Sequence, residues 1–279
     1  MVSFLTIPWL EPGGKIMCWG LDNRLNRIIK QDNRTVMLAV DHGYFLGPTT
    51  GLEVPKKTIE PLLPYADSLM LTRGILRTSV DSDTSVPIVL RVSGGNSILS
   101  KELSDEDITV SMEEAIRLNV SAVALSIYVG SEYEHRTIVN LSKLVDEGEK
   151  YGIPVLAVTA VGREMIRDAK YLGLCCRIAA EMGAHFVKTY YCEDFEKVVK
   201  NCPVPVVIAG GKKTPEKDAL NLAFDAVSHG ATGVDMGRNI FQSENPVAMI
   251  KAVRAIVHEN ASVDDAYKLF KGLEKEQNK

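Results

Sequence analysis

Lys188 is the side chain in this sequence with the clearest chemical potential. It stands in the middle of the strand-like run "AHFVKTYY" (184–191), in which alternate residues face opposite sides. Both sides hold apolar or aromatic residues, so the lysine does not simply belong to a solvent-facing side. A buried lysine loses solvation, its pKa falls, and the neutral amine can attack a carbonyl carbon. A lysine at the rim of a strand would do none of this, and the run itself leaves both interpretations open.

Two other side chains could support carbonyl chemistry. Tyr128 ends the run "SAVALSIY", and a positioned phenol can move a proton while a carbinolamine collapses or a carbon–carbon bond breaks. Asp41 ends the run "TVMLAVD" and could hold a lysine charged, orient a hydroxyl group or take a proton. The alternatives are a core aromatic for Tyr128 and a strand-end turn residue, shortly before Gly43, for Asp41.

The cysteines and histidines give weaker indications. Cys192 follows the run that contains Lys188, so a thioester-forming nucleophile is conceivable, but no basic partner for it is evident. Cys175 and Cys176 lie in a helical pattern, where they are expected to be packing residues. His42 and His135 could be bases. The five histidines show no HxH or HExxH spacing and the five cysteines no CxxC spacing, so we predict no metal site.

These groups lie in or just after short runs that are apolar on both faces, as parallel strands buried on both sides are. Helical patterns separate the runs, and eight alternations within about 210 residues predict one (β/α)8 barrel, an α/β fold in which reacting groups gather at the carboxyl ends of the strands. The runs are "TVMLAVDHG" (35–43), "DSLMLTRG" (67–74), "VPIVLRVSGG" (86–95), "SAVALSIYVG" (121–130), "IPVLAVTAVG" (153–162), "AHFVKTYY" (184–191), "VPVVIAGG" (204–211) and "TGVDMGRNI" (232–240).

The segments between the runs contain helix start and stop signals. Ser111 stands three residues before Glu114, as in a capping box. A second helix is expected in 214–230, with Thr214 as its cap, Pro215 in its first turn and Gly230 past its end. Further helical patterns, each closing on a glycine, are "YEHRTIVNLSKLVDEGEKYG" (133–152) and "DAKYLGLCCRIAAEMG" (168–183).

No linker divides the chain, so residues 1–279 are predicted to form one domain. Residues 1–30 are an N-terminal extension, whose segment 18–30 predicts a helix over the closed end of the barrel. Residues 262–279 are expected to be a C-terminal helix and tail. The stretch after the second run is short for a helix, so that unit is expected to be irregular. The alternative is a doubly wound open sheet, which usually needs fewer repeats, and no GxGxxG turn follows the first run.

The loops after the last two runs favour a phosphate site. In (β/α)8 barrels such a site often forms from the loops after strands 7 and 8. Gly210 and Gly211 in the first loop, and Gly237 in the second, let backbone N–H groups approach an anion, and Arg238 adds a charged fork. A single glycine pair could merely form a tight turn, but two such loops in the final positions favour phosphate.

The composition excludes several classes of partner. Hydrophobic residues make up 46% and charged residues 24%, the balance of an ordinary globular protein. The net charge is −4 and there is no basic block, which argues against nucleic acid. The start shows no signal peptide, and no run approaches the roughly 20 apolar residues of a membrane span. An odd cysteine count without a framework indicates reduced thiols, so we expect a soluble cytoplasmic protein.

Five stretches together resemble the archaeal-type class I aldolase (DeoC/FbaB) family: "DHGYFLGPTTGLE", "SIYVGSEYEH", "MGAHFVKTYY", "CPVPVVIAGGKK" and "GVDMGRNIFQ". The resemblance runs from about residue 16 to 270. It implies a (β/α)8 barrel in which Lys188 forms a Schiff base. It also matches Asp41 and Tyr128 to catalytic positions of the family, and Gly210, Gly211, Gly237 and Arg238 to its phosphate loops.

Within the family, "LTRGILR", "VLRVSGGNS" and "KTYY" are most similar to a branch of thiolases in autoinducer-2 breakdown. Fructose-bisphosphate aldolases of the family usually have Lys-Gly after strand 2 and Pro-Arg-Gly after strand 5, where this chain has "TRG" and "AVGRE". The resemblance implies a phosphorylated β-diketone as substrate and coenzyme A as the acetyl acceptor, with no tightly bound cofactor. His42, Arg73 and Arg91 would then contact the diketone or coenzyme A, ordinary salt bridges being the alternative for the arginines. Relatives form rings of barrels, so a homo-oligomer, by resemblance a decamer, is expected.

Two other functions stay open. A Schiff-base aldolase acting on a phosphorylated sugar would turn over without coenzyme A. A non-catalytic barrel that senses a phosphorylated ligand would keep its binding after Lys188→Ala, and borohydride would trap no imine.

Overall fold

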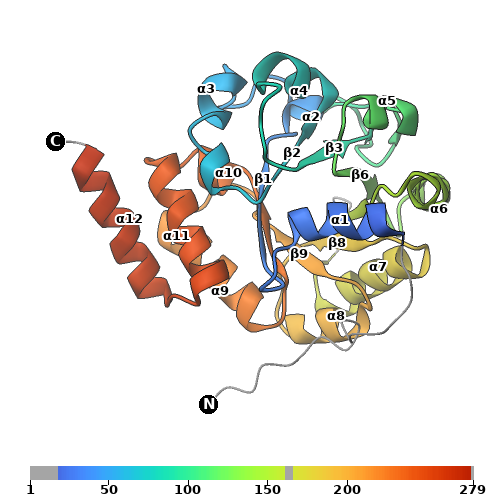
Figure 1. The fold of residues 1–279 in the computed structure, drawn as a ribbon. Coiled ribbons are helices and arrows are strands. Elements are labelled where there is room, and N and C mark those ends of the chain that lie inside the picture. The colour runs from blue at the N-terminus through green and yellow to red at the C-terminus, as the bar shows by residue number, and fades with distance from the viewer. Residues whose placement is uncertain (1–17, 161–165, 278–279) are drawn as a thin grey trace.

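The computed structural model describes residues 18–160 and 166–277 as a closed barrel of eight parallel strands surrounded by helices (Figure 1). The barrel confirms the predicted fold class, and each of the eight predicted runs contains one barrel strand. The doubly wound alternative is wrong, because β1 pairs with β10 and closes the sheet. The barrel strands are β1 (Thr35–Ala39), β2 (Ser68–Thr72), β3 (Ile88–Arg91), β6 (Ala122–Ile127), β7 (Val155–Thr159), β8 (Phe186–Thr189), β9 (Val206–Ala209) and β10 (Gly233–Met236).

The apolar pattern of the strands follows from burial on both faces. One face packs against the helices, and the other fills the barrel interior with a separate apolar cluster. Phe186 belongs to this interior cluster and stands two residues before Lys188 on the same strand. Since alternate strand residues share a face, Lys188 projects into the barrel above the apolar layer.

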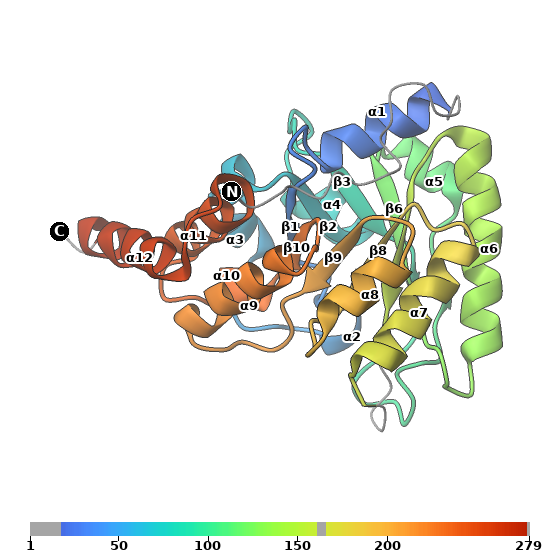
Figure 2. The same cartoon turned by 90° about the horizontal axis from the view of Figure 1, so that it is seen from below.

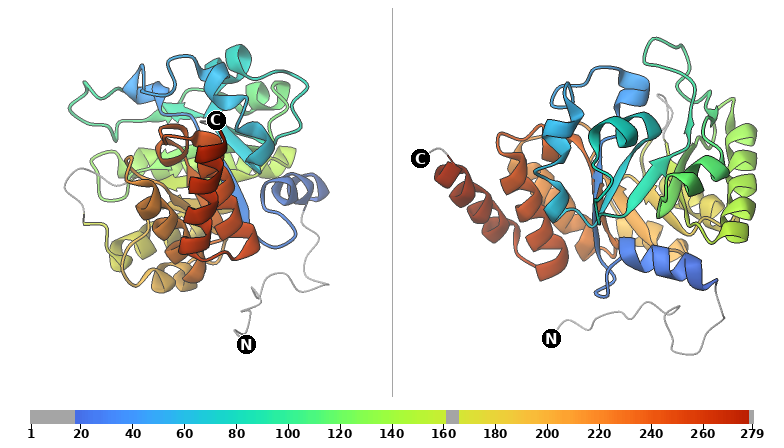
Figure 3. Two further views of the ribbon diagram at one scale, coloured as in Figure 1. Left: turned by 90° about the vertical axis from the view of Figure 1, so that its left-hand side faces the viewer. Right: turned by 45° about the horizontal axis from the view of Figure 1, so that its top comes forward.

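Helices are arranged around the outside of the barrel in the views of Figures 2 and 3. They are α1 (Trp19–Ile28), α2 (Gly43–Leu46), α3 (Pro55–Ile59), α4 (Arg73–Ser79), α5 (Met112–Arg117), α6 (Glu134–Tyr151), α7 (Ala169–Glu181), α8 (Phe195–Asn201), α9 (Glu216–Ser228), α10 (Arg238–Phe241), α11 (Pro246–Glu259) and α12 (Val263–Gln277), with a 3₁₀ turn at Leu63–Tyr65. An antiparallel pair, β4 (Ser93–Gly94) and β5 (Asp107–Ile108), lies outside the barrel sheet. None of the helices in the described ranges is long and apolar enough to cross a membrane.

The two predicted terminal helices are present. Helix α1 closes the amino-terminal end of the barrel, because Ile28 is buried in the interior cluster and Leu25 packs against it. Arg24 ties this helix to the barrel by donating from Nη1 to the carbonyl oxygen of Gly152, at 3.1 Å. Helix α12 packs along α11 at one flank, with Phe270 fully buried (Figures 1 and 3). Residues 1–17 of the predicted extension and 161–164 of the "AVGRE" motif lie outside the described residues.

Three local predictions had different outcomes. Ser111 caps α5 as predicted, accepting from the backbone N–H of Glu114 at 3.2 Å. Thr214 does not cap α9: the cap position is Pro215, and the Thr214 hydroxyl donates to Asn239 Oδ1 instead. The unit after the second strand was expected to be irregular, but it contains a helix of seven residues, α4.

Candidate active site

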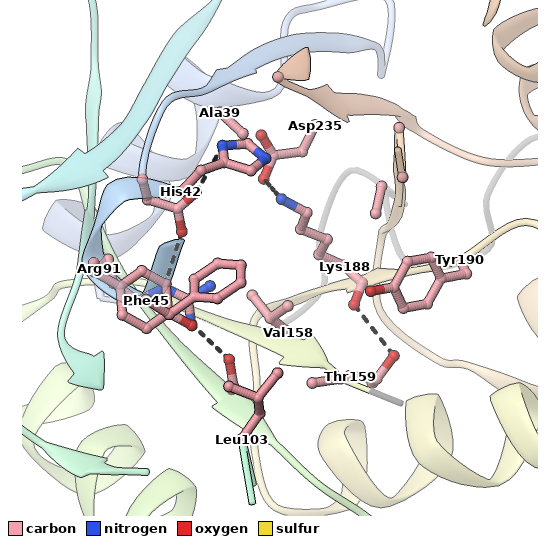
Figure 4. Close-up of a pocket in the computed structure, with 18 of the residues that line it drawn as sticks. Ala39, His42, Phe45, Arg91, Leu103, Val158, Thr159, Lys188, Tyr190 and Asp235 are labelled. Atoms are coloured by element: carbon pink, nitrogen blue, oxygen red, sulfur yellow. Dashed lines mark hydrogen bonds and ion pairs between the residues drawn. The ribbon is translucent and has the colours of Figure 1, made fainter. Parts of the chain in front are cut away.

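One pocket opens at the carboxyl ends of the barrel strands, and Figure 4 shows side chains from several strands converging on it. It brings together nearly all of the predicted site residues: Asp41, His42, Arg91, Tyr128, Lys188, Gly210, Gly211, Gly237 and Arg238. Arg73 is the exception. It begins α4, is exposed, and lines a neighbouring hollow rather than this pocket. The chain turns into a helix directly after β2, which carries the guanidinium away from the pocket.

Lys188 lies inside the barrel and pairs with a carboxylate. Its Nζ is 2.8 Å from Oδ2 of Asp235 on β10, and the exposed fractions of the two side chains are 10% and 0%. Figure 4 shows the lysine extending across the pocket toward Asp235. Lys188 is therefore buried rather than at an exposed rim. Burial raises the pKa of Asp235, although the lysine beside it acts in the opposite direction.

Asp41 and Arg91 form a second buried ion pair in the same pocket. Arg91 donates from Nε to Oδ2 of Asp41 at 3.0 Å and from Nη1 to the hydroxyl of Ser126 at 2.7 Å. Burial alone would raise the pKa of Asp41, but the charges of Arg91 and then Lys188 hold it below its usual value. Asp41 is thus an ionised group of the pocket wall, and the carboxylate in direct contact with the lysine belongs to Asp235.

His42 is the third titratable group beside this pair. Its Nδ1 is 3.9 Å from Oδ1 of Asp41, and its ring meets the edge of Phe241 with the centroids 5.6 Å apart. Burial, only partly offset by Asp41, lowers the pKa of His42 to about 4. The imidazole is consequently neutral near pH 7 and can accept or donate a hydrogen bond without adding charge.

Glu106 holds two phenols in the part of the pocket wall next to Arg91. Its Oε1 accepts from Tyr128 Oη at 2.8 Å and from Tyr44 Oη at 2.7 Å, and its Oε2 accepts from Ser93 Oγ at 2.6 Å. Burial and the neighbouring Glu106 raise the pKa of both tyrosines, so both stay protonated. Tyr128 is the predicted acid–base residue, whereas Glu106 and Asp235 were missed by sequence reasoning.

The predicted phosphate loops line the same pocket. Gly237 allows β1 and β10 to approach closely, since a Cβ there would lie 2.3 Å from the carbonyl oxygen of Ala39 and 2.4 Å from Cε1 of His42. Gly211 has φ +71°, a conformation that favours glycine. The Nε of Arg238 is buried and has no hydrogen-bond partner among the described residues, so it is available to a ligand in the pocket.

The weaker sequence candidates lie outside the pocket. Cys192 is buried beyond β8, and burial raises the pKa of its thiol, which makes it a poor nucleophile. Cys175 and Cys176 are buried packing residues of α7. His135 lies on α6 and is not among the lining residues. Within the described ranges no cluster of histidine, cysteine and carboxylate residues could hold a metal ion.

Fold and pocket together define a (β/α)8 barrel with a buried lysine in a pocket at the carboxyl ends of its strands. The sequence profile described as DeoC/LacD family aldolase matches residues 35–243, and the chain belongs to this family.

Curated relatives match the chain over nearly its whole length. A 3-hydroxy-5-phosphonooxypentane-2,4-dione thiolase of Photorhabdus laumondii is 60% identical over 254 residues, covering 90% of this chain and 87% of the relative. A protein of the same name from Escherichia coli K12 is 56% identical over 266 residues, covering 95% and 91%. Among solved structures, an archaeal fructose-1,6-bisphosphate aldolase with its catalytic lysine bound to a carbinolamine intermediate has a TM-score of 0.78 and 27% identity, covering 85% of this chain and 99% of that one.

Proposed function

We propose that this protein is a thiolase that cleaves 3-hydroxy-5-phosphonooxypentane-2,4-dione with coenzyme A, giving acetyl-CoA and dihydroxyacetone phosphate. One observation supports this most directly: Lys188 is buried beside Asp235 in a pocket that also contains the two glycine loops and Arg238. A carbonyl compound that carries a phosphate can contact both groups in this pocket. The thiolases at 56–61% identity supply the choice of substrate.

Schiff-base formation begins with the loss of a proton from the Lys188 ammonium group, because only the neutral amine attacks a carbonyl. Asp235 Oδ2, at 2.8 Å, is the adjacent acceptor. The raised pKa of Asp235 makes it a better base than an ordinary aspartate. The amine then adds to the ketone, water leaves, and the resulting iminium withdraws electrons from the neighbouring carbon–carbon bond.

Bond cleavage follows when the thiol of coenzyme A adds to the acetyl carbonyl. Collapse of this adduct forms the thioester, and the electrons of the broken bond move into the iminium to give an enamine on Lys188. Protonation at carbon and hydrolysis release dihydroxyacetone phosphate. Arg238 and the loop N–H groups would hold the phosphate throughout, so that binding energy far from the reacting carbon supports the chemistry. Coenzyme A acts here as a co-substrate, and no step uses a tightly bound cofactor.

A Schiff-base aldolase acting on a phosphorylated sugar is the second candidate, favoured by the likeness to the fructose-1,6-bisphosphate aldolase structures. It uses the same lysine and the same phosphate contacts, but an aldehyde, rather than a thiol, takes part in the second half of the reaction. Dependence on coenzyme A separates the two functions.

The test incubates the enzyme with the phosphorylated diketone, with and without coenzyme A, and quantifies acetyl-CoA. We expect acetyl-CoA from the wild type with coenzyme A present, and none above background from Lys188→Ala. Lys197→Ala is the matched control, because that lysine is exposed and pairs with Asp194 on the surface. A wild type that forms no acetyl-CoA would reject the thiolase. Borohydride trapping with dihydroxyacetone phosphate, read by the mass of the Lys188 peptide, would then identify an aldolase or, if nothing is trapped, a barrel that only binds.

We also propose a cytoplasmic, homo-oligomeric protein, by resemblance a decamer. Exposed apolar side chains such as Trp19 and Leu99 are available for subunit contacts. Light scattering after size-exclusion chromatography gives the mass directly, and a monomer at micromolar concentration would refute the assembly.

A further inference from the structure

Glu106 accepts three hydrogen bonds within the pocket wall. Both of its oxygens are occupied, since Oε1 accepts from two phenols and Oε2 from the Ser93 hydroxyl, and the residue is 2% exposed. A carboxyl group that accepts three O–H donors acts as an ionised acceptor. Glu106 therefore places a negative charge, fixed by three hydrogen bonds, behind the phenols of Tyr44 and Tyr128.

This arrangement fixes the direction of the phenol hydrogens. Each tyrosine has one O–H, and in both residues it points at Glu106 Oε1. What Tyr128 presents to the pocket is therefore a lone pair, and it can accept a proton from a bound molecule only while passing its own proton to Glu106. Tyr128 would otherwise have to become a phenolate or an oxonium ion, and the charge of Glu106 together with burial opposes the phenolate.

We propose that Glu106 is a positioning residue that stores, through Tyr128, the proton released by the thiol of coenzyme A and later returns it to the enamine carbon. The proposal rests on the proposed thiolase function and assigns the proton traffic within it. Tyr128 is the relay because it directly follows β6 and lines the pocket. Tyr44 lies under the Arg91 guanidinium, 5.0 Å from its ring centroid, and also lines two neighbouring hollows, as a wall residue does.

The steps balance without any additional reagent. The thiol S–H bond breaks, its electron pair forms the bond from sulfur to the acetyl carbon, and its proton moves to Tyr128 Oη as the Tyr128 proton moves to Glu106. The carbonyl π electrons go to oxygen and return as the carbon–carbon bond breaks. The electrons of that bond form the C=C bond of the enamine while the C=N π electrons of the iminium move to nitrogen. Glu106 then returns its proton to Tyr128, whose former proton forms the new C–H bond. Overall, the thiol hydrogen is replaced by the acetyl group and a hydrogen ends on carbon.

Two assays on the purified protein test the relay. One measures the rate of acetyl-CoA formation, and the other measures deuterium exchange from D2O into dihydroxyacetone phosphate without coenzyme A. Exchange requires the Schiff base, loss of a proton from its neighbouring carbon to give the enamine, and return of a deuteron to that carbon, but no coenzyme A. The variants are Glu106→Gln, which keeps the shape and an accepting oxygen, Tyr128→Phe, and the double variant. Glu102→Gln on the same loop is the control, because the Glu102 side chain is exposed and accepts a hydrogen bond from the Ser104 hydroxyl rather than from a phenol.

We expect Glu106→Gln to lower both rates by about 10²- to 10⁴-fold, the range for loss of a general acid–base group. Borohydride should still trap the Lys188 imine at the wild-type yield, because Glu106 takes no part in forming it. The double variant should be no slower than the slower single variant, because both substitutions interrupt one relay.

The relay would be overturned if Glu106→Gln exchanged deuterium at the wild-type rate. It would also be overturned if the rate loss in the double variant were the product of the losses in the two single variants. Loss of imine trapping in Glu106→Gln would also overturn it, since the residue would then be needed for the shape of the site. If the wild type forms no acetyl-CoA, the proposed function fails and the thiol is refuted as the proton source. The exchange assay then decides separately whether Glu106 supplies the proton to carbon.

Discussion

Replacing Lys188 with methionine should destabilise the protein in a way that depends on pH. Methionine keeps an unbranched apolar side chain but removes the ammonium group that lies 2.8 Å from Asp235 Oδ2. The Asp235 side chain is fully buried, so bulk water does not solvate its carboxylate. The variant therefore leaves a carboxylate inside the barrel without its nearest positive charge.

The burial of the pair sets the size of the effect. A surface pair contributes about 0–1 kcal/mol, whereas removing one partner of a buried pair costs about 3–5 kcal/mol. Both side chains lie inside the barrel, so the larger range applies. At about 2–4 °C per kcal/mol, the midpoint of thermal unfolding should fall by roughly 6–20 °C near neutral pH.

The pH dependence of this deficit has a definite sign. Burial already raises the pKa of Asp235 in the native protein, and removing the lysine takes away an opposing influence. A carboxyl with a raised pKa binds more protons in the folded than in the unfolded state, so stability falls as pH rises. The deficit of the variant should be small at low pH, where Asp235 is protonated in the folded wild type as well. It should grow by up to about 1.4 kcal/mol per pH unit between the raised folded pKa of the wild type and the still higher folded pKa of the variant.

Denaturant and thermal unfolding between pH 4 and 9 measure the effect in Lys188→Met, in Lys188→Met/Asp235→Asn and in Lys197→Met. The double variant should recover most of the stability at high pH, because neither charge remains, while staying inactive. The Lys197 control should differ from the wild type by less than about 1 kcal/mol, since its pair is exposed. If Lys188→Met is as stable as the wild type at pH 8, the inference that Lys188 stabilises the buried Asp235 carboxylate is refuted.

Three further outcomes are expected. Arg238→Gln should raise KM for the phosphorylated substrate about 10- to 100-fold with little change in kcat, because it removes one charge-assisted contact worth about 1.5–3 kcal/mol; unchanged steady-state kinetics would exclude the contact. Gly237→Ala should lower stability by about 1–3 kcal/mol, since the added Cβ would lie 2.3 Å from the Ala39 carbonyl oxygen, and thermal unfolding measures this. The pKa of His258 is raised because hydrogen bonds to Asp67 and Asp32 outweigh the effect of burial. Its contribution to stability should therefore be present below pH about 6.5 and disappear as pH rises through the folded pKa; melting curves from pH 5 to 9 should show this slope in the wild type and lose it in His258→Gln.

The barrel could be predicted because parallel strands buried on both faces leave continuous apolar runs between helical patterns. Lys188 was evident for the same reason, since a charged residue stands out within such a run. The errors are local. Arg73 was placed at the end of a strand, but helix α4 begins at that residue. Thr214 resembled a helix cap, but its hydroxyl donates to Asn239, whose position depends on the packing of the last two barrel loops.

The two carboxylates that complete the site could not be found in this way. Asp235 lies two residues before Gly237, in a segment that indicates a phosphate loop. Its contact with Lys188 depends on the closed sheet, in which β10 and β8 lie on either side of β9 and both side chains point into the barrel. Glu106 is one of several acidic residues in "KELSDED" (101–107), all equivalent by composition. The antiparallel pair of β4 and β5 holds Glu106 beside Ser93, and this non-local pairing is what directs one carboxylate inward.

The buried charges of the pocket are connected across three strands. Asp41 on the β1 side binds Arg91 on β3, and the Nη1 of Arg91 lies 3.4 Å from the Ser93 hydroxyl that donates to Glu106. Glu106 in turn holds Tyr128 at the end of β6. Burying so many charged groups costs stability that an apolar barrel end would retain. We therefore infer that the network fixes the position and protonation state of each group before substrate binds. Dipoles and charges that are already in place need no rearrangement during the reaction.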